Sequence, residues 1–117
     1  MTPVEPTELV AGRWQLRPWP AASADLDDVL AALHPGADLA ALRRARLEGW
    51  ARGDLLGFAV REITTGTAEG EALVVVDDGH ARVQVHPLPD VGDPALADEV
   101  AAVLGRWAGG ALGLRTG

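Results

Sequence analysis

Three segments of strand length follow one another in the middle of the chain, and a turn signal follows each of the first two. They run from Leu55 to Thr64, from Ala72 to Val76 and from Ala81 to His86, with turns at Thr65-Gly66 and Asp77-Asp78-Gly79. Turns of this kind, above all Asp-Gly, join neighbouring strands of a hairpin. The uninterrupted apolar run in the second segment is typical of a central strand. This part of the chain therefore predicts a largely antiparallel sheet.

One more strand is predicted before these three, from Leu9 to Trp19. Within it Trp14, Leu16 and Pro18 alternate with arginine and glutamine, so one side of the strand faces the core. Residues 1 to 8 contain two prolines and are expected to form a flexible arm. The folded domain is then expected to span residues 9 to 117.

Three segments have the apolar period of a helix. The first has Ser23 as its predicted N-cap, with Asp25 in its first turn, and stops at His34-Pro35-Gly36. The second runs from Asp38 to about Arg52 and is closed by Gly53. The third has Asp93 as its cap and Pro94 as its first residue. Its expected buried stripe consists of Leu96, Val100, Val103, Leu104, Trp107 and Ala111. The order β-α-α-β-β-β-α predicts one α+β domain, a mostly antiparallel sheet flanked by helices.

Composition excludes several classes of protein. With 48% apolar residues the 117-residue chain is not a disordered protein, and its 10 basic and 17 acidic side chains, a net charge of −7, argue against nucleic-acid binding. No window is apolar enough to cross a membrane, so a soluble, cytoplasmic protein is expected. The absence of Cys, Lys, Tyr and Asn removes thiolate, Schiff-base, phenolic and carboxamide chemistry, and points to a high-GC genome.

Several segments together resemble a known family. Leu16-Arg17-Pro18-Trp19 before an acidic helix, Gly53 to Val60, Thr65-Gly66 with Glu69-Gly70, and Leu96 to Arg115 follow the order of GNAT-superfamily N-acyltransferases, in particular the branch that acetylates ribosomal-protein N-termini. The resemblance covers nearly the whole chain but only the first two-thirds of a full-length member. It implies that the distal strands, and the later helix that often carries a Tyr acid, have no counterpart here.

The same resemblance implies an acyl-CoA pyrophosphate loop of the form Arg/Gln-x-x-Gly-x-Gly/Ala at the N-terminus of the third helix. Here it reads Gly92, Asp93, Pro94, Ala95, Leu96 and Ala97, and only the last position matches. Ala95 restricts close backbone approach, Pro94 lacks an amide donor, and Asp93 adds a negative charge and is expected to cap the amides that the anion needs. In the strand before it, which holds the pantetheine arm in the family, Pro87 cannot donate either.

The candidate chemical groups each have an ordinary interpretation as well. His80 and His86 are suited to base catalysis or are structural. Asp77, Asp78 and His80 either hold a metal or simply form a turn. We favour the turn, so no metal site is expected. Glu62, Glu69 and Glu71 either activate water or face solvent as strand charges. Arg43, Arg44, Arg46 and Arg52 form a basic helix face that is either solvated or a docking surface for an acidic partner. The four tryptophans are core, or one of them anchors an interface.

Taken together, these features favour a shortened GNAT-like domain with a degenerate loop, no cofactor and a binding or assembly role. The alternative is an acetyl-CoA-dependent N-acetyltransferase acting on an amine of a protein or small molecule, with Glu71 or His86 as base. A gene remnant without a selected role is a third possibility. Because the distal strands are missing, an exposed sheet edge is expected, covered by a homodimer or by a protein partner.

Overall fold

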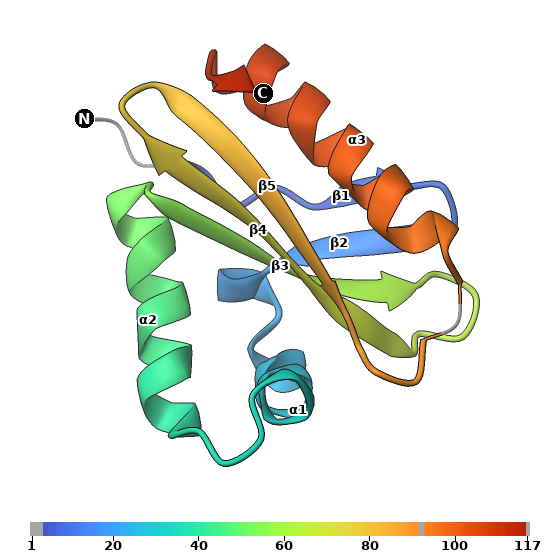
Figure 1. The fold of residues 1–117 in the computed structure, drawn as a ribbon. Helices are drawn as coiled ribbons and strands as arrows, with labels where there is room; N and C mark the ends of the chain where they lie inside the picture. The colour runs from blue at the N-terminus through green and yellow to red at the C-terminus, as the bar shows by residue number, and fades with distance from the viewer. Residues whose placement is uncertain (1–3, 92, 117) are drawn as a thin grey trace.

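The computed structural model describes residues 4–91 and 93–116, of which the side chains of 23–26 and 116 are not described. In chain order the elements are β1 (Leu9–Ala11), β2 (Trp14–Pro18), the 3-10 helix η1 (Trp19–Ala21), α1 (Ser23–Leu33), α2 (Leu39–Arg52), β3 (Leu55–Glu62), β4 (Ala68–Asp77), β5 (His80–Pro87), α3 (Ala95–Gly110) and β6 (Arg115–Thr116). Figure 1 shows α3 on one face of the sheet and α1 and α2 on the other. No helix among the described residues is long and apolar enough to cross a membrane.

The sheet runs in the order β1-β2-β3-β4-β5-β6, and the pairings among its first five strands are all antiparallel. This confirms the antiparallel sheet expected from the turns. Asp78 and Gly79 both have positive φ, 51° and 76°, between the paired residues Asp77 and His80. Two positive φ angles give the hairpin the twist that matches its strands, which is why an Asp-Gly pair is found there.

The core lies where the two helical layers meet the sheet. Trp14, Leu16 and Pro18 of β2 are buried as the alternation predicted. Trp50 of α2 and Trp107 of α3 both contact Phe58 edge-on, with ring centroids 5.4 Å apart in each pair. The end of the sheet is therefore closed by an aromatic cluster in which helices of both layers meet.

The N-terminal strand differs from the prediction. Instead of one strand from Leu9 to Trp19, there is a short hairpin, β1 against β2, followed by η1. Gly12 has a φ of 58° and makes the turn, a conformation that the alternating pattern around it does not reveal. The predicted arm lies partly inside the described residues, where Val4 packs against the core.

Two helix ends also differ. Ser23 is the first residue of α1 rather than its cap, which is Ala22, and its side chain lies outside the described ones. α3 begins at Ala95, one residue after Pro94, and ends before Ala111, which is exposed rather than part of the buried stripe.

The strand after α3 was expected to lie beyond Gly117, and this is wrong. Gly113, with a φ of 68°, turns the chain back, and β6 pairs parallel to the first residues of β5. The N–H of Arg115 donates to the carbonyl of Gly79 at 2.9 Å. The sheet therefore carries the start of a sixth strand, which matches only His80 and Ala81.

α2 has the ends that the sequence predicts. Asp38 is the N-cap, and its carboxylate accepts from the N–H of Ala41 at 3.1 Å, while Gly53 closes the helix with a φ of 78°. Gly49 lies so close to the start of β3 that an added Cβ would be 2.6 Å from the carbonyl oxygen of Leu55 and 2.7 Å from its Cβ. The helix approaches the sheet at a point where only glycine fits.

We predict that Gly49→Ala lowers the free energy of unfolding by about 1–3 kcal/mol, because the methyl group forces α2 away from β3. The matched control is Gly105→Ala in α3, where an added Cβ meets nothing within 4 Å. That change is expected to stabilise by about 0.5–1 kcal/mol, since alanine loses less backbone entropy. Urea unfolding measures both; equal effects would contradict the close approach.

Candidate functional site

In the loop before α3, the side chain of Asp93 bonds to the backbone of the helix start and to Arg13. Oδ1 of Asp93 accepts from the N–H of Ala95 at 2.9 Å, and its other oxygen pairs with the guanidinium of Arg13. The N–H of Leu96 donates to the carbonyl of Asp93 at 3.3 Å. The carboxylate of Asp93 thus bonds one of these amides, as expected, but the N-cap residue of α3 is Pro94 rather than Asp93. Gly92 lies outside the described residues. From Pro94 to Leu96 each amide is therefore either missing or already bonded within the chain.

The surroundings of this loop are acidic. A cavity of about 410 Å³ beside it is lined by Glu69, Asp90 and Asp93, with Arg13 as the basic residue among its lining. That arginine already pairs with Asp93. Leu96 is fully buried and Ala97 is half-buried. Both side chains are apolar, so neither offers a polar contact. The loop is a poor cradle for a pyrophosphate, because carboxylates repel the anion that the dipole at a helix N-terminus attracts.

Pro87 and Leu88, at the end of β5, offer no free donor. Pro87 has no N–H, and the N–H of Leu88 donates to the carbonyl of Glu69 at 2.8 Å. Pro87 lies opposite Gly70, where an added Cβ would be 2.6 Å from the carbonyl oxygen of His86. The two strands therefore pack tightly here.

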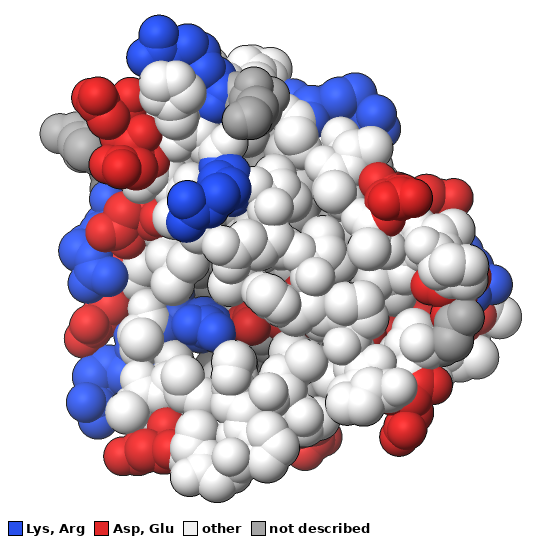
Figure 2. All heavy atoms as spheres, in the orientation of Figure 1, with Lys and Arg blue, Asp and Glu red and all other residues white. Residues whose placement is uncertain are grey.

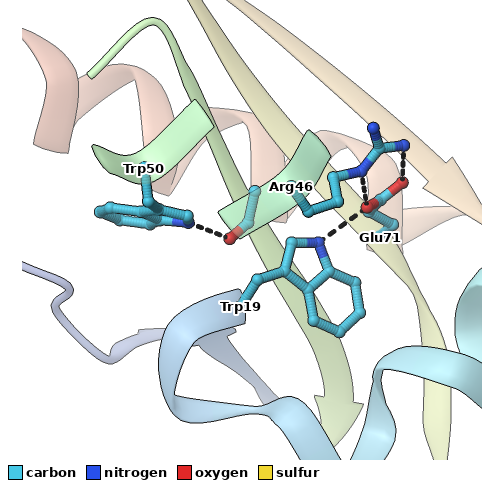
Figure 3. Close-up of polar contacts among 5 residues, drawn as sticks. Trp19, Arg46, Trp50 and Glu71 are labelled. Atoms are coloured by element: carbon cyan, nitrogen blue, oxygen red, sulfur yellow. Dashed lines mark hydrogen bonds and ion pairs between the residues drawn. The ribbon is translucent and has the colours of Figure 1, made fainter. Parts of the chain in front are cut away.

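Glu71 forms the most buried polar cluster of the described structure, with Arg46 and Trp19 (Figure 3). Its Oε2 accepts from Nε of Arg46 at 2.7 Å and from Nε1 of Trp19 at 2.7 Å, and its Oε1 accepts from Nη2 of Arg46 at 3.1 Å. Glu71 is 0% exposed and Arg46 is 8% exposed. The interpretation of Glu71 as a solvent-facing charge is therefore wrong, and so is the place of Arg46 in a basic surface.

This cluster changes what Glu71 can do chemically. Both carboxylate oxygens are held by N–H donors of a cation and an indole, and no water reaches them from outside. A general base must lie within hydrogen-bond reach of the proton that it takes. Glu71 in this arrangement holds α2 and η1 to the sheet.

The other acid–base candidates lie apart from one another. His86 is exposed and directly opposite Glu71 in the strand register, while His80 is exposed at the hairpin with its Nδ1 3.3 Å from the carbonyl of Asp78. Glu69 accepts from Nε1 of Trp14 at 2.6 Å, and Glu62 is half-buried. Among the described residues no three side chains of the metal-binding types come together.

The remaining arginines of α2 are mostly paired. Arg43 pairs with Asp27 of α1, and Arg52 lies 3.7 Å from Glu48 and 3.0 Å from Asp54. Along the side of the molecule where α2 lies, Figure 2 shows basic and acidic groups in alternation. A surface of mixed sign does not provide the continuous basic face that the sequence suggested.

The sequence analysis placed Arg46 on a surface and gave Arg13 no role, and both form ion pairs within the fold. Arg46 lies four residues after Leu42 and four before Trp50, so the helical period places it on the inward stripe and is the signal that could have found it. Arg13 belongs to the turn between β1 and β2 and meets Asp93 eighty positions later in the chain. No local pattern indicates that contact.

The fold can now be compared with solved structures. No protein-family model and no curated protein matches the sequence. A putative ribosomal-protein-serine acetyltransferase from Vibrio cholerae superposes with a TM-score of 0.72 at 19% identity, over 97% of this chain and 72% of that one. An acetyltransferase from Agrobacterium tumefaciens gives 0.71 at 18%, over 95% and 71%. A GNAT-family acetyltransferase from Bacillus anthracis gives 0.62 at 15%, over 92% and 69%.

The chain has the GNAT fold. It spans about 70% of the length of these GNAT structures, in agreement with the expected shortening. At identities below 20% the likeness concerns the fold, and the site has to be judged from its own residues.

We predict that Arg46→Met lowers the free energy of unfolding by about 3–5 kcal/mol, because it leaves Glu71 buried without its cation. Adding Glu71→Gln to that variant is expected to restore part of the loss. Arg43→Met, which breaks an exposed pair, is the control and costs less than about 1 kcal/mol. Urea unfolding of the wild type and the three variants measures these losses, and equal losses for Arg43→Met and Arg46→Met would contradict the prediction.

Proposed function

We propose that this protein is a degenerate GNAT-fold domain that does not transfer acyl groups and serves as a binding or assembly module. The observation that carries the proposal is the loop before α3, where Asp93 takes the position of an anion and leaves no amide free from Pro94 to Leu96. No bound cofactor belongs to this function.

The buried cluster supports the same proposal. A base at Glu71 would have to leave Arg46 and Trp19 before it accepted a proton, and the unpaired guanidinium would remain buried. The carboxylate of Glu71 is bonded within the fold, whereas an acyltransferase that used Glu71 as its base would need this carboxylate free.

The partner that we propose covers the edge of β5, where among the described residues β6 pairs with His80 and Ala81 alone. Sheet edges with unpaired backbone groups are templates for a further strand. A second copy of the chain, or another protein, would supply it.

The alternative function is acetyl-CoA-dependent N-acetylation of an amine, because the superposed proteins are acetyltransferases. In that scheme His86 is the base, because it is exposed and Glu71 is not. Acetyl transfer that disappears in His86→Ala would support this alternative.

We predict that calorimetric titration with acetyl-CoA, with free CoA as the control, gives no saturable heat at millimolar ligand. The physical reason is that the described part of the loop offers the pyrophosphate no free amide from Pro94 to Leu96, and the arginine beside it is already paired with Asp93. Saturable binding at about micromolar concentration, or cofactor-stimulated acetyl transfer above background, would overturn the proposed function.

Removing the internal anion is expected to open the loop. Asp93→Ser keeps an oxygen that can accept from Ala95 but removes the charge and frees Arg13, so weak acetyl-CoA binding, about millimolar, should appear. Asp90→Ser removes the same charge from the exposed side of the loop and is expected to leave binding undetectable. The role of Asp93 is refuted if calorimetry gives the same result for both variants.

A further inference from the structure

The hairpin between β4 and β5 contains Asp78, the one aspartate in the sequence that is followed by glycine. Both loop residues are exposed, and they have φ angles of 51° and 76°. The strand ladder pairs Asp77 with His80, so the peptide group between Asp78 and Gly79 lies outside the ladder. Because glycine has no side chain, the nitrogen of Gly79 is not shielded by its own residue.

His80, the first residue of β5, contacts this peptide group. Its Nδ1 lies 3.3 Å from the carbonyl oxygen of Asp78. Since a carbonyl oxygen only accepts hydrogen bonds, the ring nitrogen is the donor. The carbonyl oxygen of Asp78 and the nitrogen of Gly79 belong to one conjugated amide. When that nitrogen gives up its proton, negative charge spreads to the oxygen, and a donor at the oxygen stabilises this charge.

Two further features of the surroundings favour a reaction at this nitrogen. β6, at the red end of the chain in Figure 1, pairs with the start of β5 beside the hairpin. Nη2 of Arg115 in β6 lies 3.7 Å from the position that a Cβ of Gly79 would occupy, so a cation lies next to the amide. The hairpin also borders an open cavity of about 780 Å³, lined in part by Asp78 and His80, which gives solvent water access.

We propose that Asp78 is a modification site at which the chain isomerises to isoaspartate, and that the hydrogen bond from His80 promotes the reaction. The nitrogen of Gly79 loses its proton and attacks Cγ of the Asp78 carboxyl group. A new C–N bond forms, and the hydroxyl group leaves with that proton as water. The product is a cyclic imide, a succinimide.

Solvent water then opens the ring at either of its carbonyl carbons. Addition at Cγ restores aspartate. Addition at the backbone carbonyl carbon of Asp78 breaks the original peptide bond and leaves the chain connected through Cγ, with the backbone carboxylate free. The water lost in the first step is regained in the second, so the isomerisation needs no other reactant and does not depend on the proposed function.

The modification loosens β6. Isoaspartate adds a methylene carbon to the backbone of the hairpin, whose two-residue loop otherwise matches the twist of its strands. The carbonyl of Gly79 in this loop accepts from the N–H of Arg115 at 2.9 Å. β6 has two residues, so displacement of that carbonyl removes a large part of its attachment to the sheet.

The test stores the full chain in mildly acidic buffer at body temperature and measures isoaspartate over time. The chain contains no lysine, so trypsin releases residues 62 to 82 as one peptide. Mass spectrometry with electron-transfer fragmentation then distinguishes isoaspartate at residue 78 from isoaspartate at residue 77. His80→Phe removes the donor, and His86→Phe, which changes another exposed histidine of β5, is the matched control. The three proteins are also stored unfolded in urea.

We expect isoaspartate to accumulate at residue 78 of the folded wild type. His80→Phe should slow its formation about fivefold, which is the effect of one hydrogen bond on a rate, and His86→Phe less than about twofold. In urea neither change should have an effect, because the contact with His80 is then absent. No isoaspartate at residue 78 of the folded chain, equal effects of the two variants, or an equal effect of His80→Phe in urea would overturn the proposal.

The effect on β6 is measured by amide hydrogen exchange, followed by NMR, on fresh and stored protein. In isomerised chains the N–H of Arg115 should exchange about tenfold faster. The N–H of Gly66, which donates to the carbonyl of Glu62 in another hairpin at 2.8 Å, is the control and should not change. Asp78→Glu, which would have to form a larger ring, should keep the fresh rate after storage. Unchanged exchange of Arg115 in isomerised chains would overturn the link to β6.

Discussion

The ion pair between Arg46 and Glu71 is the constraint on which the arrangement of the two layers depends. A carboxylate in the middle strand of a sheet is costly to bury unless a cation and further donors accompany it. Here one side chain of α2 and the indole of η1 supply all three hydrogen bonds. The position of α2 over the sheet is thus determined by charge as well as by apolar contact. A buried pair of this kind costs more when one partner is removed than it contributes when intact.

In the loop before α3 a carboxylate is again bonded within the fold, and here the bond occupies an amide that could otherwise hold a ligand. A helix N-terminus has unsatisfied amides, and some group must bond to them. When that group is an external phosphate, the site depends on a ligand; when it is Asp93, the helix is capped without one. Arg13 then neutralises the carboxylate from the other end of the chain. The helix start is therefore stable with no ligand bound, and any anion must compete with an acceptor that is covalently part of the chain.

Much of the fold could be predicted from local pattern, and the differences have physical causes. The Asp77-Asp78-Gly79 hairpin and the Asp38 and Gly53 ends of α2 were confirmed, since each depends on a few neighbouring residues. The turn at Gly12 was missed because alternation of apolar residues continues on both sides of it. β6 was missed because two residues carry no periodic signal.

The candidate site was harder to predict, because burial of a charged side chain is decided by its partner. Glu71 and Arg46 are each ordinary surface residues when considered alone, and they are distant in the sequence. The period of α2 places Arg46 inward, and an inward arginine requires a carboxylate on the facing strand. Applied to the rest of the chain, the same reasoning distinguishes arginines that hold the fold together from those that are left over. The second group consists of Arg44, Arg82, Arg106 and Arg115, which are exposed and form no ion pair with any described residue.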